Sequence, residues 1–158
     1  MIARPTTQQL LDDCAREVRD TIMPIVDDPA VRVRLEMLEQ LLSSCAVRAA
    51  HEMAWMAEEC ERLERFTADV VAVFPDADEV SVALDEYRGA AASPTGSSLH
   101  LDDRVRLYDL AGQAFGAALD VAMASGHAEL AAGAKAVIHA RVDREAECRP
   151  GFYFPGRS

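Results

Sequence analysis

The sequence predicts an all-α fold, a helical bundle with one or two long amphipathic helices and a C-terminal helical hairpin. Apolar residues recur at helical spacing along most of the chain, and helix caps and breakers stand where these runs begin and end. No strand-like alternation of useful length occurs. With 158 residues, 50% of them hydrophobic and 27% charged, the chain has the size and composition of one globular domain. We therefore predict a single helical domain over residues 1–158.

The first helix is predicted to run from Thr7 to Met23. Thr6 and Gln9 form the T-x-x-Q pattern of a capping box, in which each residue satisfies a backbone N–H of the other. Apolar positions recur at helical spacing as far as Ile22. Pro24 then ends the run, because proline has no backbone N–H to donate.

The second helix is predicted to begin at Asp28 and Pro29, which suit an N-cap and a first helical position. No glycine or proline interrupts residues 30–74. Steps of four and three residues, with one stutter at Ala49, define an apolar stripe of Val31, Leu35, Leu38, Leu42, Cys45, Ala49, Met53, Met56, Cys60, Leu63 and Phe66 or Thr67. So long a helix is uncommon, so a break at Ser43 or near Phe66 stays open.

Three shorter helices are predicted after Pro75. The first ends near Arg88, has an ambiguous period and precedes a flexible loop at residues 89–98 (GAAASPTGSS). The next runs from about residue 99 to 124 and closes at Gly126, and the last runs from about residue 128 to 148. We expect the second, fourth and fifth helices to form the main core, with the first packed across one end.

The charge of the chain indicates which partners to exclude. A formal net charge of -11 opposes binding to nucleic acid and to anionic membrane surfaces.

The N-terminus lacks the pattern of a signal peptide, so we expect a cytoplasmic location. The four cysteines have no metal-type spacing and are predicted to be reduced packing residues.

No motif for catalysis, nucleotide binding or metal binding is complete, which disfavours an enzyme, and we expect no bound cofactor. The alternative is a small-molecule (acyl or metal) binding protein or an enzyme with a site between helices near His51 and His139, since two histidines and two carboxylates could converge there and a soft apolar pocket lies nearby. The residues of this candidate ligand site are His51, Trp55, Met56, Glu58, His139 and Asp143.

Residues 149–158 form a C-terminal tail with three consecutive aromatic residues, Phe152, Tyr153 and Phe154. Termini are usually polar, so these rings are expected to cover an apolar surface. Packing over a groove of the same chain is the favoured interpretation. Docking on a partner subunit is the alternative.

The opening segment RPTTQQLLDDCAREVRDTIMPIV resembles a family of small bacterial helical proteins of unknown function, over roughly the first forty residues. Members of that family are often encoded beside aminoglycoside-phosphotransferase-like kinases and acyl-CoA dehydrogenases. The resemblance implies a protein partner in acyl-CoA or related small-molecule metabolism. It implies no catalytic residues.

The long stripe of the second helix is more apolar than one short hairpin can cover, which predicts self-association as a two-fold dimer. The favoured function is therefore a non-enzymatic interaction or accessory protein that acts through apolar helix faces.

Overall fold

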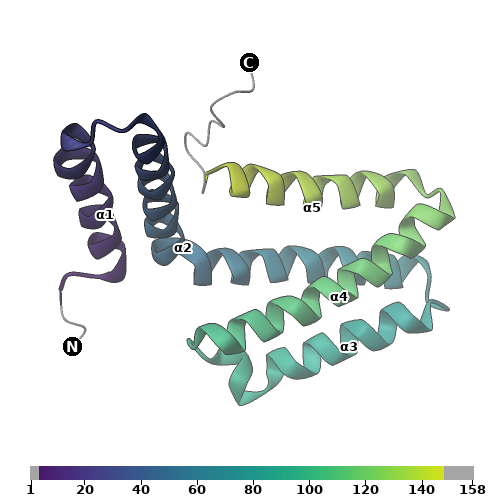
Figure 1. Cartoon of the computed structure of the whole chain (residues 1–158). Helices are drawn as coiled ribbons and strands as arrows, with labels where there is room; N and C mark the ends of the chain where they lie inside the picture. The colour runs from purple at the N-terminus through teal and green to yellow at the C-terminus, as the bar shows by residue number, and fades with distance from the viewer. Residues whose placement is uncertain (1–3, 148–158) are drawn as a thin grey trace. The chain divides into compact units, whose positions relative to one another are not determined.

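A computed structural model of the chain describes residues 4–147 and confirms the all-α fold (Figure 1). The described residues contain no strand. The elements are α1 (Thr7–Glu17), a π-helical turn (Val18–Ile22), a 3-10 turn (Met23–Ile25), α2 (Pro29–Val73), α3 (Asp78–Ala92), a 3-10 turn (Pro94–Ser97), α4 (Leu101–Ser125) and α5 (Ala128–Glu147). Among the helices within residues 4–147, none is long and apolar enough to cross a membrane.

The chain divides into two compact units, and α2 runs through both. Within the described residues, one unit contains residues 4–52 and 143–147, and the other contains Met53–Val142. We call α1, the turns after it and α2 as far as Glu52 the N-terminal hairpin, and we call Met53–Val142 the bundle unit. The two units share α2, and the single domain expected over residues 1–158 stays a prediction.

The capping box at the start of α1 is confirmed. Thr6 donates its backbone N–H to Gln9 Oε1 at 2.9 Å, and Gln9 donates its own to Thr6 Oγ1 at 3.3 Å. The end of this helix differs from the prediction, because a π-helical turn and a 3-10 turn replace its last residues. In a regular helix the ring of Pro24 would meet the carbonyl group four residues earlier, and these turns avoid that geometry.

The second helix begins as predicted. The Asp28 carboxylate accepts the backbone N–H groups of Ala30 at 2.8 Å and Val31 at 3.3 Å. The helix then continues without interruption from Pro29 to Val73, through both Ser43 and Phe66. Thr67 is fully buried there, and its hydroxyl donates to the Leu63 carbonyl at 2.8 Å instead of breaking the helix.

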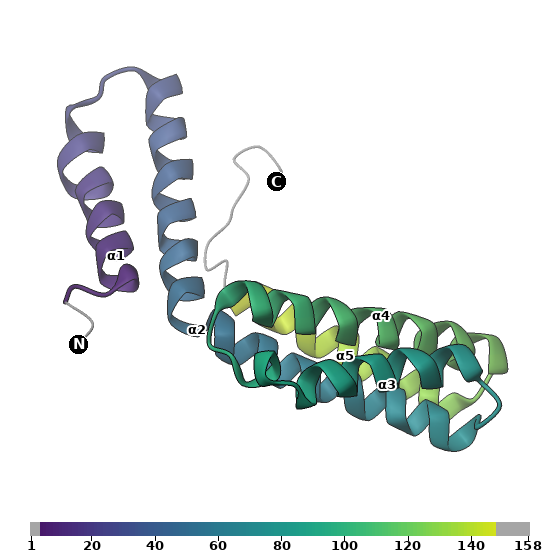
Figure 2. The same ribbon diagram turned by 90° about the horizontal axis from the view of Figure 1, so that it is seen from below.

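The bundle unit consists of four helices that lie side by side, namely the second half of α2 with α3, α4 and α5 (Figure 2). Two buried clusters form its core. The first is Phe66, Val70, Val80, Ala118, Ala122, Leu130 and Ala134. The second is Cys60, Leu63, Leu84, Tyr87 and Ala111. The core thus contains α2, α4 and α5 as expected, and α3 in addition, which contributes Val80, Leu84 and Tyr87 and was not expected there.

Two more boundaries in the bundle unit differ from the sequence-based expectation. α3 begins after Ala77, which has no side-chain acceptor, and it extends through Gly89 into the alanines that follow. Most of the segment predicted as a loop at residues 89–98 is thus the last turn of α3 and a 3-10 turn, since alanine favours helix. The left-handed cap after α4 is confirmed, with Gly126 at a φ of 67°.

Candidate interaction surface

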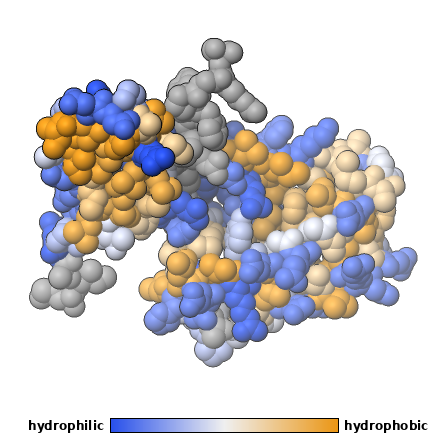
Figure 3. Space-filling view, in the orientation of Figure 1, coloured by the Kyte–Doolittle hydropathy of each residue, from blue (hydrophilic) through white to orange (hydrophobic). Residues whose placement is uncertain are grey.

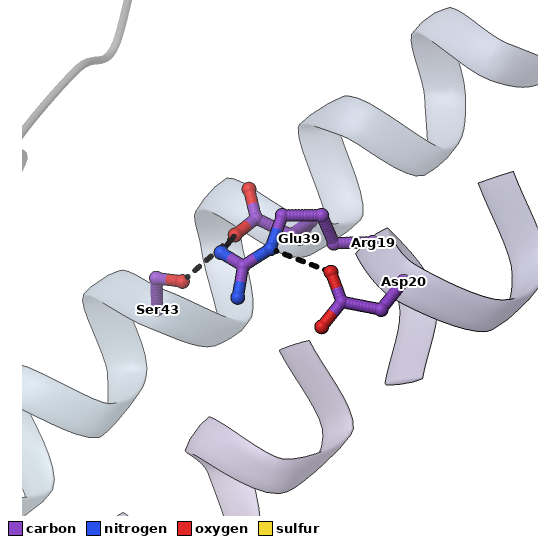
Figure 4. A network of polar contacts seen from close by, with 4 residues as sticks. All are labelled: Arg19, Asp20, Glu39 and Ser43. Carbon is purple, nitrogen blue, oxygen red and sulfur yellow. Dashed lines mark hydrogen bonds and ion pairs between the residues drawn. The ribbon is translucent and has the colours of Figure 1, made fainter. Parts of the chain in front are cut away.

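The two helices of the N-terminal hairpin are antiparallel neighbours whose alignment is fixed by a polar contact near the turn. The Arg19 guanidinium binds Glu39 Oε1 at 3.2 Å and Asp20 Oδ1 at 3.2 Å (Figure 4). Ser43 donates its hydroxyl to the same Glu39 oxygen at 3.3 Å. Arg19 and Glu39 are therefore at the same level along the hairpin.

The hairpin buries little apolar surface. Of its described residues, the fully buried apolar ones are Ala15, Val18 and Ala46. Eight large apolar residues of the hairpin are exposed: Leu10, Ile22, Ile25, Val31, Val33, Met37, Leu38 and Leu41. Figure 3 shows apolar surface gathered over this part of the chain. Two helices have only one mutual contact line, so the other apolar residues remain in water.

Four of these residues, together with Cys14 and Cys45, share one side of the hairpin, which we call the hairpin face: Leu10, Cys14, Val31, Leu38, Leu41 and Cys45. On α1, Leu10 and Cys14 each precede a more buried residue of the contact line (Leu11 and Ala15), and on α2 Leu38 and Cys45 precede Glu39 and Ala46 in the same way. In two antiparallel helices, an equal one-residue offset turns both rows to the same side. The hairpin face is therefore continuous across both helices.

Opposite charges border the two edges of the hairpin face. Asp13 and Glu17 lie on the outer flank of α1, one residue before and three after Cys14. Arg34 and Arg48 lie on the outer flank of α2, each one helical turn from the apolar row. All four side chains are exposed, and Asp13 also pairs with Arg16 at 3.0 Å and Arg48 with Glu52. The face thus has an acidic edge along α1 and a basic edge along α2, where Glu52 pairs with Arg48.

The six residues of the candidate ligand site are mostly exposed and are divided between the two compact units. His51, Glu58, His139 and Asp143 are exposed, while Trp55 and Met56 are half-buried. His51 and Asp143 belong to a different compact unit from the other four. Within residues 4–147, no three His, Cys, Asp or Glu side chains are grouped to hold a metal ion. The small-molecule or metal site stays a prediction, and Phe152, Tyr153 and Phe154 lie outside the described residues.

A polar cluster that the sequence analysis missed lies inside the bundle unit. Glu59 of α2 is only 8% exposed, and its Oε1 accepts the Tyr108 hydroxyl of α4 at 2.9 Å. Arg141 of α5 places its Nε 3.7 Å from the same oxygen and its guanidinium 5.9 Å from the centre of the Tyr108 ring. The buried carboxylate is therefore held by a phenol donor and a neighbouring cation.

The spacing of the apolar residues that follow Glu59 in the sequence indicates that its side chain is buried. Glu59 precedes Leu63, Phe66 and Val70 at the helical spacing of four, seven and eleven residues, so it shares their buried side of α2. Mixed charges from Glu58 to Arg65 are typical of a solvated helix flank. The spacing of Glu59 contradicts that interpretation at this one position.

The chemistry of this cluster favours a structural role over a catalytic one. Burial, reinforced by the adjacent Glu59 carboxylate, raises the pKa of the Cys60 thiol to about 11. Burial and then the hydrogen bond to Glu59 raise the pKa of Tyr108 to about 12, and burial together with Cys60 raises that of Tyr87 to about 12. A nucleophilic cysteine needs a lowered pKa, so Cys60 is suited to packing.

The chain matches no protein-family model, no curated protein and no solved structure. The resemblance of its opening segment to the bacterial helical family therefore stays a prediction.

Proposed function

We propose that this protein is a non-enzymatic interaction protein that binds another polypeptide through the hairpin face. The observation that carries the proposal is the imbalance within the hairpin, which exposes eight large apolar residues, four of them on the hairpin face, and buries only Val18 and two alanines. Contiguous exposed apolar surface is characteristic of binding sites in soluble proteins. The border of acidic and basic side chains supports the same proposal, because binding surfaces combine an apolar centre with a polar rim.

The bundle unit has a supporting role in this proposal. It buries fourteen apolar residues around the second half of α2, so it can hold that helix without help from a partner. The first half of α2 continues the same helix and presents the hairpin face. A stable bundle joined to an incompletely covered hairpin suits a subunit that recruits or links other chains.

The test compares two double variants that add the same charges at different surfaces. Leu38→Glu with Leu41→Glu changes the hairpin face, and Val82→Glu with Met123→Glu changes exposed residues of the bundle unit. We expect the first variant to lose every stable complex of the protein, whether with itself or with another protein, because buried carboxylates cost several kcal/mol. We expect the second to keep them.

Complexes are measured by sedimentation of the purified chain and by affinity capture from its native host, with circular dichroism to check that each variant is folded. If both variants retain the same complexes, or if the unaltered chain forms none in either assay, the hairpin face is not a binding site and the proposal is wrong.

A further inference from the structure

We propose that the occupant of the hairpin face is a second copy of this chain, and that the two hairpins form an antiparallel four-helix assembly. This inference rests on the proposed function and names its partner. The bundle unit consists of four helices, and three of them cover the stripe of α2, whereas the hairpin consists of only two helices. A second hairpin would supply the two that are missing.

The charges at the edges support a second copy over an unrelated protein, because the hairpin face complements itself. A two-fold axis parallel to the helices places α1 of each copy on α2 of the other. By the alignment at Arg19 and Glu39, Asp13 is then closest in level to Arg48, and Glu17 lies between the levels of Arg34 and Arg48. The acidic edge of each copy thus faces the basic edge of the other, and this happens twice. A two-fold axis across the helices would place α1 on α1 and α2 on α2, with like charges together. The edges therefore select the first arrangement.

The alignment of the hairpin adds a prediction at the level of single residues. Starting from the contact between Arg19 and Glu39, five residues back along α1 reach Cys14 and six residues onward along α2 reach Cys45. The two cysteines are thus nearly level, and both lie on the hairpin face. Rotation about an axis parallel to the helices preserves this level, so Cys14 of one copy would lie across from Cys45 of the other.

The decisive experiment uses two full-length variants with reversed edges. Arg34→Glu with Arg48→Glu makes both edges acidic, and Asp13→Arg with Glu17→Arg makes both edges basic. Each variant alone is expected to dimerise about tenfold or more weakly than the unaltered chain, because like charges meet across the interface. Their equimolar mixture is expected to form a heterodimer of restored affinity, since each acidic edge then meets a basic one. Sedimentation at tens of micromolar and at two salt concentrations measures this.

Oxidation gives a second readout that does not depend on charge. In a Cys148→Ser background, diamide should take two electrons and two protons from paired thiols and link two chains by a disulfide. The linked dimer should disappear in either Cys14→Ser or Cys45→Ser, whereas Cys60→Ala should leave it unchanged.

The outcomes separate this inference from the proposed function. If the unaltered chain is monomeric but Leu38→Glu with Leu41→Glu abolishes capture of another protein, the proposed function stands and the second copy is wrong. If deletion of residues 151–158 turns a monomer into a dimer, the tail of the same chain occupies the face, and the inference is again wrong. A mixture of reversed variants that associates no better than its components also overturns it.

Discussion

The apolar stripe of α2 is buried in the bundle unit and partly exposed in the hairpin. In the bundle unit, Cys60, Leu63 and Phe66 are 8%, 4% and 4% exposed, because α3, α4 and α5 cover them. In the hairpin, Val31 and Leu38 keep the same spacing and are 39% and 43% exposed. The spacing of apolar residues therefore predicts that a face will be covered, and the number of neighbouring helices decides whether its own unit covers it.

The two regions also differ in where their charged side chains lie. The bundle unit encloses Glu59 with the Tyr108 hydroxyl and Arg141, so a charged group there is part of the interior. The hairpin keeps its charges on the flanks of the apolar face, and Glu39 joins its helices at a half-buried position. Polar groups stabilise the first region from inside. In the second, most of them lie on exposed flanks.

The largest difference between the regions is expected from truncating one apolar side chain in each. Phe66→Ala removes a buried ring that lies 5.2 Å from the Phe115 ring, and it should lower the free energy of unfolding by about 3–5 kcal/mol. Leu38→Ala should change it by less than about 0.5 kcal/mol in dilute protein, because the Leu38 side chain is already partly in water. Urea unfolding followed by fluorescence of the single tryptophan, Trp55, measures both. If Phe66→Ala and Leu38→Ala lowered the free energy of unfolding by similar amounts, the difference in burial between the two regions would not determine their contribution to stability.

A smaller effect is expected from the polar cluster. Tyr108→Phe removes the phenol that donates to Glu59 and leaves a buried carboxylate with fewer donors, so the free energy of unfolding should fall by about 1–3 kcal/mol. Adding Glu59→Gln should cost less than the sum of the two single changes, because the two groups interact directly. Additive losses in this double-mutant cycle, measured by urea unfolding, would show that the contact does not stabilise the bundle unit.

Local signals in the sequence predicted much of this fold. Thr6, Asp28 and Gly126 act as the caps that their residue types suggested, because capping depends on only a few neighbouring residues. The membership of α3 in the core was missed, since Val82 between Val80 and Leu84 made the period ambiguous. The buried residues are Val80, Leu84 and Tyr87, at helical spacing, and Val82 is 66% exposed.

The candidate sites were harder to predict, because they depend on which helices become neighbours. The stripe that contains Val31 and Leu38 was recognised, but the contributions of Leu10 and Cys14 to the same face follow only from the antiparallel alignment of α1 and α2. The pairing of Glu59 with Tyr108 joins residues 49 positions apart, so no local pattern reveals it. Sequence spacing identifies faces, whereas partners across helices require the tertiary arrangement.

The smallest expected effect is a loss of stability at alkaline pH that originates in the bundle unit. Its Cys60, Tyr87 and Tyr108 have pKa values of about 11, 12 and 12 when folded, against ordinary values of 9.0 for the thiol and 10.0 for the phenols. As the pH rises above about 9, the unfolded chain loses these protons first, so the free energy of unfolding should fall until the folded groups also ionise. The stabilising contribution is complete below pH 9 and is lost between about pH 9 and 12.

Cys60→Ala should reduce the slope mainly between about pH 9 and 11, and Tyr108→Phe mainly between about pH 10 and 12. Cys14→Ser in the hairpin serves as the matched thiol control, since Cys14 is exposed. Urea midpoints at pH 8 and pH 10.5, followed by circular dichroism, measure the slope. A midpoint that rises with pH, or a Cys14→Ser effect as large as that of Cys60→Ala, would contradict the assignment of this titration to the bundle interior.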